Sequence, residues 1–203
     1  MSDIVVTGCA GFIGSHLCES LLKEGYQVIG IDNFDSYYDR RFKERNLAIL
    51  RDRKRFEFLE ADIRDFDDLR RKIRKAEVVI HLAARPGVRP SMRDPKSYAD
   101  ANILGTISVL ELALKLDANQ FIFGSSSSVY GLDEVPFRED RPADRPLSVY
   151  GGTKRASEII LHAYSYNYGL PVTILRFFTV YGPRVRPDMA IYKFAKGIFL
   201  GEE

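Results

Sequence analysis

Tyr150 and Lys154, four residues apart, are the residues of this chain best suited to do chemistry, and Ser126 precedes them. On a helix, side chains at positions i and i+4 share one face, so the lysine ammonium can lie close to the phenol. A free phenol titrates near pH ~10, and a neighbouring positive charge lowers that pKa by favouring the phenolate. The three residues therefore predict a site that takes a proton from a hydroxyl group under oxidation. Taken alone, the pair has a second interpretation as an exposed helical pair.

The elements that would position these residues alternate along the chain. Short apolar runs typical of buried strands occur at residues 4–6, 27–31, 56–60, 78–80, 121–123 and 172–175. Helical periodicity occurs between them, at residues 12–23, 65–75, 98–116 and 149–168. Such alternation predicts an α/β fold, a three-layer doubly wound parallel sheet of the Rossmann type. This domain is expected at residues 1–176, and residues 177–203, which belong to no complete α/β unit, are expected to begin an incomplete second domain.

A glycine-rich turn follows the first predicted strand. Gly8, Gly11 and Gly14 fall at its first, fourth and seventh positions, and Asp32 ends the next strand. Glycine lets the backbone approach a pyrophosphate, and the following helix offers its N-terminal N–H groups to the phosphates. A carboxylate at Asp32 would accept hydrogen bonds from ribose hydroxyls and repel a 2′-phosphate. The first domain is therefore predicted to bind NAD rather than NADP.

Three further segments carry groups that a ligand or a helix neighbour would use. Residues 125–128 are four serines after an apolar strand, at the strand end where open α/β sheets bind ligands, so they predict contacts with a sugar. Asn102 and Gly105 interrupt the long predicted helix, and close helix packing is the better interpretation of both. Arg184 and Arg186 follow the last strand, where a surface loop and a fork onto a carboxylate or phosphate are equally supported.

Composition narrows the classes of protein further. The net charge of +2 is too small to indicate a polyanion partner. Basic clusters at residues 51–55 and 70–75 have acidic neighbours and no interleaved aromatics, which predicts solvated helix faces and no nucleic-acid partner. The scattered His16, His81 and His162 are interpreted as packing or surface residues, and the cysteines lack zinc-site spacing, so no metal is expected. Without a membrane-length apolar run or a leader-like segment, a cytoplasmic protein with no membrane partner is expected.

Together these segments resemble one family, the extended short-chain dehydrogenase/reductases of the nucleotide-sugar epimerase and dehydratase group. The motifs that carry the resemblance stand at residues 7–16, 62–63, 81–84, 102–106, 124–131 and 150–154. Within the group, residues 32–39, 85–92 and 181–190 are most similar to segments of the UDP-glucuronate 4-epimerases. The resemblance implies a C-terminally truncated member that binds NAD and a UDP-sugar and forms a homodimer, with residues 177–203 beginning its substrate-binding domain.

The resemblance also implies which residues act. The cofactor cleft would be formed by Gly8, Gly11, Phe12, Ile13, Gly14, Asp32, Asn33, Asp62, Ile63, Leu82, Ala83, Ala84, Asn102, Tyr150 and Lys154. The catalytic residues would be Ser126, Tyr150 and Lys154. Substrate contacts would come from Arg89, Ser126, Ser127, Ser128, Thr179 and Arg186, the last four near a glucuronate carboxylate.

The serines indicate which reaction of the family to expect. The 4,6-dehydratases carry Thr-Asp-Glu where this chain has residues 126–128, and the UDP-glucuronate decarboxylases carry a glutamate in place of Ser128. Without these carboxylates the site is expected to oxidise and re-reduce a hydroxyl without elimination. The expected reaction is 4-epimerisation of UDP-glucuronate to UDP-galacturonate through a transient 4-keto sugar, and the chain by itself is expected to bind NAD with little or no turnover.

Other functions remain as alternatives. Within the family they are 4-epimerases acting on UDP-glucose or on UDP-N-acetylhexosamines, and the related decarboxylases and dehydratases. From another class, a non-catalytic dinucleotide-binding module is the alternative. Such a module would have no use for a base, so the presence of Ser126, Tyr150 and Lys154 together argues against it.

Overall fold

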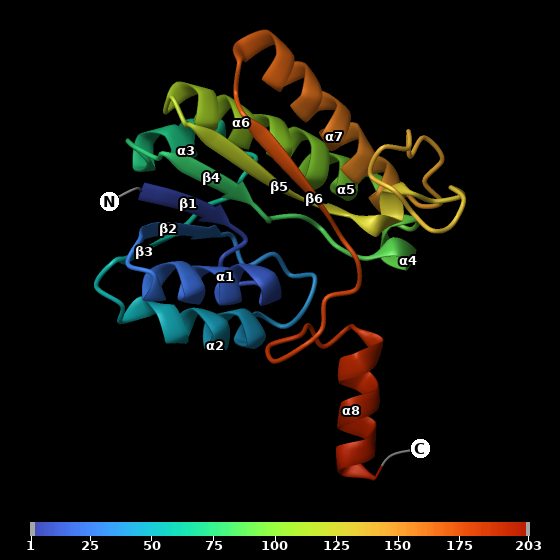
Figure 1. Ribbon diagram of the computed structural model, residues 1–203. Helices are drawn as coiled ribbons and strands as arrows, with labels where there is room; N and C mark the ends of the chain where they lie inside the picture. The colour runs from blue at the N-terminus through green and yellow to red at the C-terminus, as the bar shows by residue number, and fades with distance from the viewer. Residues whose placement is uncertain (1–2, 202–203) are drawn as a thin grey trace.

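Valine and isoleucine fill β1, β2 and β4, whose side chains are largely buried, as a parallel sheet between two helical layers requires. The computed structural model describes residues 3–201 and arranges six parallel strands in the order β3-β2-β1-β4-β5-β6 (Figure 1). The strands are β1 (Asp3–Thr7), β2 (Gln27–Asp32), β3 (Phe56–Glu60), β4 (Val78–His81), β5 (Gln120–Ser126) and β6 (Val172–Phe177). The predicted doubly wound fold is confirmed. Residues 1–2 and 202–203, at the ends of the two predicted domains, lie outside the described part.

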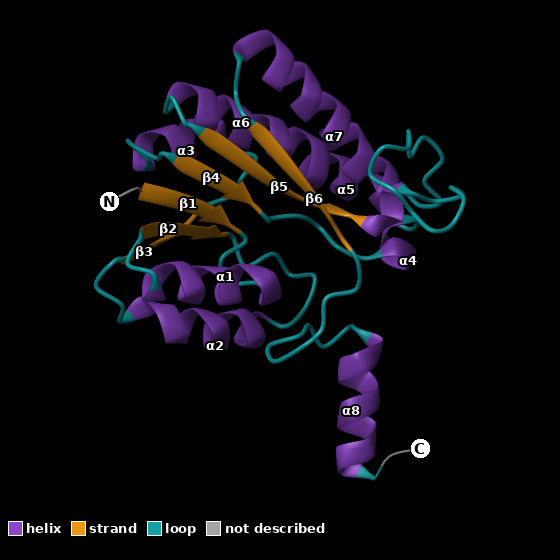
Figure 2. Cartoon of the chain, viewed as in Figure 1, coloured by secondary structure: helices purple, strands orange, loops and turns teal. Residues whose placement is uncertain are grey.

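Helices lie on both faces of this sheet. On one face, beside β1, β2 and β3, are α1 (Phe12–Lys23) and α2 (Arg40–Arg51); on the other are α3 (Phe66–Lys72), α5 (Pro95–Ala99), α6 (Gly105–Lys115) and α7 (Val149–Tyr168) (Figure 1). Three short elements lie between these along the chain. They are α4 (Val88–Ser91) before α5, a π-helical segment (Asp100–Leu104) between α5 and α6, and a 3-10 turn (Ser127–Val129) directly after β5. The last helix, α8 (Ala190–Leu200), projects away from these layers (Figure 2).

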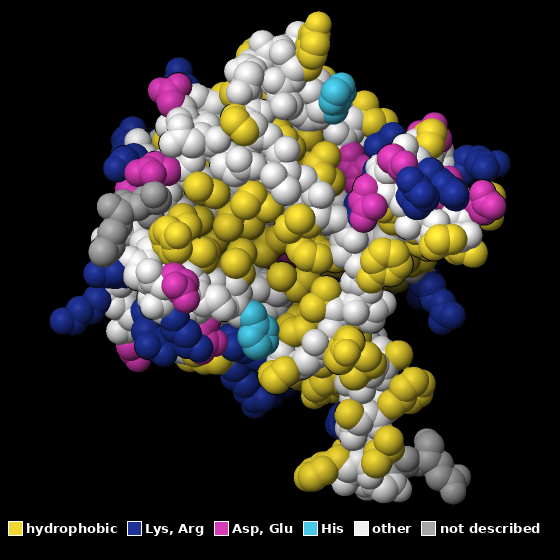
Figure 3. Space-filling view, in the orientation of Figure 1, with side chains coloured by type: hydrophobic (Ala, Val, Ile, Leu, Met, Phe, Trp, Pro, Cys, Tyr) yellow, Lys and Arg dark blue, Asp and Glu magenta, His cyan; other side chains and the backbone are white. Residues whose placement is uncertain are grey.

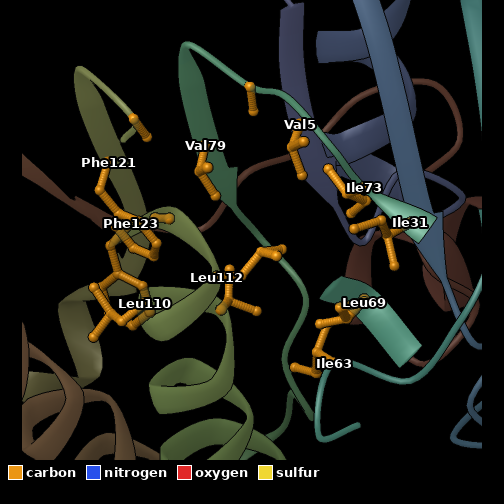
Figure 4. Packing of buried hydrophobic residues seen from close by; sticks show 14 of the residues in the cluster. Val5, Ile31, Ile63, Leu69, Ile73, Val79, Leu110, Leu112, Phe121 and Phe123 are labelled. Carbon is orange, nitrogen blue, oxygen red and sulfur yellow. The ribbon is translucent and has the colours of Figure 1, made fainter. Parts of the chain in front are cut away.

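The main core lies between the sheet and the helices α3 and α6. Strand residues such as Val5, Val79 and Phe121 point toward Leu110 and Leu112 of α6 in Figure 4, and all five side chains are fully buried. Fully burying one such side chain stabilises the fold by roughly 1.5–3 kcal/mol. Alternate residues of the same strands face α1 instead. Packing on both faces holds the strands in register, so their carboxyl ends meet at one edge of the sheet.

Two predicted helices differ from those observed. The helix predicted at residues 98–116 is three consecutive pieces, α5, the π-helical segment and α6. Gly105 begins α6 where a Cβ would lie 2.6 Å from the Cδ1 atom of Ile63, so the predicted close packing is confirmed at this glycine. The helix predicted at residues 65–75 ends at Lys72, because Ile73 is extended and fully buried.

The helix α2 has no counterpart among the sequence predictions. Its buried side includes Lys43 and Asn46 as well as Leu47 and Leu50, so it lacks the continuous apolar stripe by which amphipathic helices are recognised. The basic cluster at residues 51–55 was predicted to lie on a helix face. Only its first residue is helical and the others form the following turn, although all five side chains are exposed as expected.

The cysteines of the described residues form no disulfide. Cys9 and Cys18 are both free and buried. Within residues 3–201, no three side chains of the metal-ligating types are clustered so that they would hold an ion. Over the same residues, the model contains no helix whose length and apolar character would let it cross a bilayer.

Candidate active site

The site lies at the switch point of the sheet. From β1 the chain continues to β2 and β3 on one side, and β4 then returns to the opposite side of β1, which opens a crevice at the carboxyl ends of the strands. One cleft runs across this edge from Asp32 and Asp62 to Tyr150 and Lys154. Every residue predicted for the cofactor lines it, except Asn102. The tertiary structure therefore brings together, in one cleft, residues at or after the carboxyl ends of all six strands.

The glycine loop is sterically required to be free of side chains. Gly8 has a positive φ of 74°, and a Cβ there would lie 2.9 Å from the backbone nitrogen of Ala83. A Cβ at Gly14 would lie 2.1 Å from the carbonyl oxygen of Gly8. The loop therefore packs directly against the turn after β4 and against the start of α1, whose first residues Phe12, Ile13 and Gly14 line the cleft. The first N–H groups of a helix have no intrahelical partner, so this end of α1 suits a pyrophosphate.

Asp32 ends β2 with its carboxylate buried in a set of hydrogen bonds. Its Oδ2 accepts from the backbone N–H of Ala10 at 3.3 Å, and its Oδ1 accepts from that of Phe34 at 2.9 Å. Lys43 of α2 donates to Oδ1 at 3.1 Å and is itself buried. Lys43 lines the cleft and was not among the predicted site residues. Its spacing to Leu47 and Leu50, four and seven residues on, places it on the inner face of α2, but this helix was not predicted, so the spacing gave no signal by itself.

Asp62 stands beside Asp32 at the end of β3. Asn33 donates from Nδ2 to its Oδ2 at 3.0 Å, and Arg64 forks onto both carboxylate oxygens at 2.9 and 2.7 Å. The hydrogen bonds from Arg64 lower the pKa of Asp62 to about 2, so this carboxylate is ionised at neutral pH. Asn33 and Asp62 are thus held rigidly at the β2–β3 side of the cleft.

Asn102, predicted for the cofactor cleft, is buried behind it instead of lining it. Its side chain accepts from the backbone N–H of Arg85 at 2.7 Å, and donates to the carbonyl of Arg85 at 3.1 Å and to the Oγ1 of Thr153 at 3.0 Å. The residue lies in the π-helical segment, an irregularity frequent at functional sites. Asn102 therefore ties the loop after β4 to the helix that carries Tyr150 and Lys154.

A second buried chain of hydrogen bonds runs through His81 at the end of β4. Thr106 donates to the carbonyl of Asn102 at 2.6 Å, so its oxygen accepts from His81 Nε2 at 3.0 Å. The Nδ1 atom of His81 then accepts from Thr7 at 2.7 Å. Burial lowers the pKa of His81 to about 3, which keeps the ring neutral in this role. His81 is thus a packing residue, as predicted.

The helix α7 presents Tyr150 in its first turn. Ser148 caps the helix by accepting from the backbone N–H of Gly151 at 3.0 Å, and Ser91 accepts from that of Tyr150 at 3.0 Å. Burial raises the pKa of Tyr150, while a hydrogen bond with Ser126 and the charge of Arg186 lower it. The lowering that the sequence suggested from Lys154 is not seen, because Ser126 and Arg186 are the groups that act on the phenol.

Lys154 is buried one turn further along α7. Its ammonium donates to the carbonyl of Gly124 on β5 at 2.8 Å and lies 4.7 Å from the centre of the Phe123 ring. Burial lowers the pKa of Lys154 to about 7. The lysine therefore sits on the floor of the cleft beneath Tyr150, fixed to the strand that ends in Ser126.

The residues predicted for substrate divide into two sets. Ser126, Thr179 and Arg186 line the cleft that contains Tyr150. Ser127 and Ser128 form the 3-10 turn after β5, and Arg89 is exposed on α4, so none of these three lines it. The cleft also takes in residues that the sequence analysis did not assign, among them Asp35, Tyr37, Tyr38, Arg85, Phe178 and Met189.

Arg186 lines the cleft and forms an ion pair with Asp188. Its Nε and Nη2 atoms donate to the two carboxylate oxygens of Asp188 at 3.0 and 3.1 Å. Asp188 in turn accepts from the hydroxyl of Tyr37 at 3.4 Å. One edge of the guanidinium is therefore occupied, and its Nη1 atom remains for an anion in the cleft.

A glycine loop at the switch point of a parallel sheet, joined by one cleft to a tyrosine and a lysine on the helix after β5, defines the class of the short-chain dehydrogenase/reductases. Comparison with known proteins narrows this class: the NAD dependent epimerase/dehydratase family matches residues 4–202. The chain belongs to that family.

Individual relatives are similar over nearly the whole chain. A UDP-glucuronate 4-epimerase of Thermodesulfobacterium geofontis is 43% identical over 98% of this chain and 62% of its own length. The crystal structure of UDP-glucuronic acid 4-epimerase from Bacillus cereus, in complex with UDP-glucuronic acid and NAD, is 44% identical with a TM-score of 0.91, covering 98% of this chain and 64% of that one. A UDP-glucose 4-epimerase of Thermotoga maritima with UDP-glucose is 35% identical with a TM-score of 0.85, covering 99% and 64%. The chain thus spans less than two thirds of each of these relatives.

Proposed function

We propose that the protein carrying this chain is an NAD-dependent nucleotide-sugar 4-epimerase that interconverts UDP-glucuronate and UDP-galacturonate. The observation that carries the proposal is the cleft, which is lined by the dinucleotide-binding loop, by Ser126, Tyr150 and Lys154, and by Arg186. An isomerase of this kind needs a base, a hydride acceptor and a means of holding the sugar in one place. Bound NAD would supply the second by accepting hydride from the sugar and returning it.

The residues of the chain have separate roles in this proposal. Tyr150 takes the proton of the sugar 4-hydroxyl and later gives it back, and Ser126 hydrogen-bonds the same oxygen and orients it. Lys154 lines the cleft, where its ammonium donates to the carbonyl of Gly124, and it would hold the ribose of the bound cofactor by hydrogen bonds. The 4-keto sugar formed on oxidation rotates in the site and is then reduced on its other face. Because the hydride is returned, no net redox change results.

The acidic residues of the cleft support epimerisation over elimination. Among its lining residues in the described part of the chain, the carboxylates are Asp32, Asp35 and Asp62, all on the β2–β3 side. None stands on β5 or α7 beside Tyr150, where elimination of water requires an acid and a base. The free Nη1 atom of Arg186 supports a carboxylate-bearing sugar, and 4-epimerases of UDP-glucose remain the second candidate because one of them shares the fold at 35% identity.

The remaining expectations belong to the same proposal. Residues 177–203 are proposed to contribute to a substrate-binding part, because Thr179 and Arg186 line the cleft. In the relatives that part is longer than the segment described. The homodimer stays a prediction from the family resemblance, and the cytoplasmic location stays a prediction from the sequence.

The test is turnover with a matched pair of variants. The protein carrying this chain, incubated with UDP-glucuronate and separately with UDP-glucose, should convert the first to its 4-epimer. Tyr150→Phe should lose about 10²–10⁴-fold in turnover, the usual contribution of a general base, while its affinity for NAD stays unchanged. Tyr166→Phe is the control, because Tyr166 is 83% exposed. Conversion of UDP-glucose alone would favour the second candidate, and near-normal turnover by Tyr150→Phe would remove the tyrosine from its role.

A further inference from the structure

Arg184, two residues before Arg186, faces away from the cleft and binds the helix α1. Its Nη1 atom donates to the Oγ of Ser15 at 3.2 Å, and its Nη2 atom contacts the Nδ1 of His16 at 3.0 Å and the Oε2 of Glu19 at 2.5 Å. The side chain of Arg184 is 17% exposed and that of Glu19 is 21% exposed. A single guanidinium therefore makes three bonds to three residues on two turns of one helix.

His16 contributes a fourth bond to the same loop. A guanidinium only donates, so the Nδ1 atom of His16 accepts and its Nε2 atom carries the proton. That Nε2 atom then donates to the carbonyl oxygen of Pro183 at 2.9 Å. Both ring nitrogens of His16 thus bond this loop. The geometry requires the neutral ring with its proton on Nε2, because Nδ1 must accept from Arg184.

Without these bonds the loop has little to hold it. Arg184 has a positive φ of 65°, which is unfavourable for a side chain other than glycine. The neighbouring backbone bonds are short-range, from Val185 N–H to the carbonyl of Gly182 and from Met189 N–H to that of Arg186, both at 3.2 Å. The bonds to α1 therefore define the position of a loop whose other end, Asp188, contacts Tyr37.

The glycine loop leads into α1, and the loop that carries Arg184 and Arg186 is bonded to the same helix. Gly11 caps the N-terminus of α1, and Gly14 and Ser15 follow within its first turn and a half. The residues that receive Arg184 therefore continue directly from the cofactor loop. Arg184 is two residues from Arg186 and does not line the cleft, so a change at Arg184 leaves the lining residues themselves unaltered.

We propose that Ser15, His16 and Glu19 of α1 form a clasp for Arg184, and that this clasp positions Arg186 to receive the carboxylate of the substrate. The inference rests on the proposed function for the identity of that carboxylate. Arg184, His16 and Glu19 are positioning residues here, because they act on the substrate through Arg186. The clasp assigns a role to a histidine that follows the glycine motif and that the proposed chemistry does not use.

The first measurement needs no substrate. Amide hydrogen exchange is followed in the chain, in Arg184→Met and in His16→Phe, which keeps the ring contact with Phe12 but loses both polar atoms. Exchange at Val185 and Met189 should accelerate about tenfold or more in both variants, because local opening becomes easier. His16→Gln should restore protection, since its amide oxygen can accept from Arg184 and its amide nitrogen can donate to Pro183. Arg138→Met is the control, because Arg138 pairs with Asp140 in an exposed loop.

The second measurement compares ligands in the same variants. Affinity for UDP-glucuronate should fall about tenfold in Arg184→Met, as loss of one charge-assisted hydrogen bond predicts, while affinities for UDP-glucose and NAD stay within about twofold. Equal weakening of both sugar nucleotides would overturn the clasp as a carboxylate-positioning device, and unchanged exchange at Val185 and Met189 would overturn it altogether. If the unsubstituted protein carrying this chain binds neither sugar nucleotide, the proposed function fails, and hydrogen exchange alone decides whether the clasp holds the loop.

Discussion

At the scale of single residues, the phenol of Tyr150 illustrates how burial and charge oppose each other in this site. Burial disfavours the phenolate, and Ser126 and Arg186 favour it. Oxidised NAD carries a positive nicotinamide ring, which would favour the phenolate further when bound. The phenol of Tyr150 is therefore harder to ionise in the structure described than a free tyrosine, and its activation as a base depends on ligands that complete the cleft.

Lys154 gives a pH dependence whose sign follows from its burial. The pKa of this lysine is lowered from 10.5 to about 7 in the folded chain. Between these two values the unfolded chain holds a proton that the folded chain has lost, so unfolding takes up a proton. The free energy of unfolding should therefore rise with pH across this window. Below about pH 7 the folded lysine is also charged, and the full cost of burying the ammonium is present.

Urea unfolding at several pH values tests this prediction. The comparison is with Lys154→Met, which fills similar space and cannot titrate, so that contributions of the cysteines and tyrosines cancel. The free energy of unfolding of the unsubstituted chain minus that of the variant should become more positive from about pH 7 to about pH 10. A difference that is flat or that falls over this range would contradict the burial of a titrating ammonium.

At the scale of elements, one buried carboxylate joins two strands and a helix behind the site. Glu158 of α7 is 2% exposed. It accepts from Ser125 of β5 at 2.5 Å, from Arg155 of α7 at 3.0 Å, and from Arg176 of β6 at 3.0 and 2.9 Å. Ser125 lies between Gly124, which binds Lys154, and Ser126. Glu158 therefore fixes the strand end on which two catalytic residues depend.

Removing this charge should destabilise the chain strongly. Glu158→Gln leaves the guanidinium of Arg176 without its buried counter-charge, and breaking such a pair costs roughly 3–5 kcal/mol. Glu111→Gln is the matched control, because Glu111 on α6 is exposed and bonds only the hydroxyl of Tyr164 among the described contacts. Chemical denaturation of the two variants provides the measurement. A loss at Glu158 no larger than at Glu111 would show that the network does not hold the strand end.

The π-helical segment is the element that sequence periodicity could not predict. Residues 98–116 carry a continuous helical pattern, and the extra residue that widens the turn adds no apolar or polar signal of its own. The wider turn is defined by Asn102, whose partners Arg85 and Thr153 are distant in the sequence. The same is true of α2, whose polar inner face makes sense only beside Asp32.

At the scale of the whole molecule, the cofactor cleft spans both halves of the sheet. It is lined by residues after β1, β2 and β3 on one side and after β4, β5 and β6 on the other. A ligand that bridges both halves binds only the folded chain, and at a hundredfold excess over its Kd it stabilises by about 2.7 kcal/mol. NAD should therefore raise the thermal midpoint, and NADP should raise it less, because the carboxylate of Asp32 lines the cleft and would repel a 2′-phosphate.

Glycine variants make this a specific test. Gly14→Ala should abolish the shift caused by NAD, because a Cβ at that position would lie 2.1 Å from the Gly8 carbonyl and displace the loop. Gly152→Ala should leave the shift intact, since a Cβ there meets no atom within 4 Å. Differential scanning fluorimetry of the three proteins with both dinucleotides gives the result. An equal shift with NADP would contradict the role assigned to Asp32.

Apolar side chains are exposed on part of the surface of the described chain. Figure 3 shows hydrophobic side chains gathered over the sheet between α1 and α7 and along α8. On α8, Phe194, Ile198 and Phe199 are 70%, 82% and 88% exposed, and the helix has no buried residue. Tyr192 meets Phe42 of α2 edge-on, with ring centres 5.9 Å apart. This apolar surface is consistent with α8 belonging to the substrate-binding part proposed above.

Sequence alone determined the alternating elements, the glycine loop with Asp32, and the placement of Tyr150 and Lys154 one turn apart on the same helix. These features depend on local periodicity, on backbone sterics and on spacing along one helix, so they can be read without knowing what lies nearby. Only the tertiary structure decided that Arg186 faces the cleft while Arg184 grips α1, and that Ser126 lines the site while Ser128 does not. Which way a loop side chain turns depends on partners far away in the chain, as with Arg184 and Ser15, 169 residues apart, and no local pattern encodes that contact.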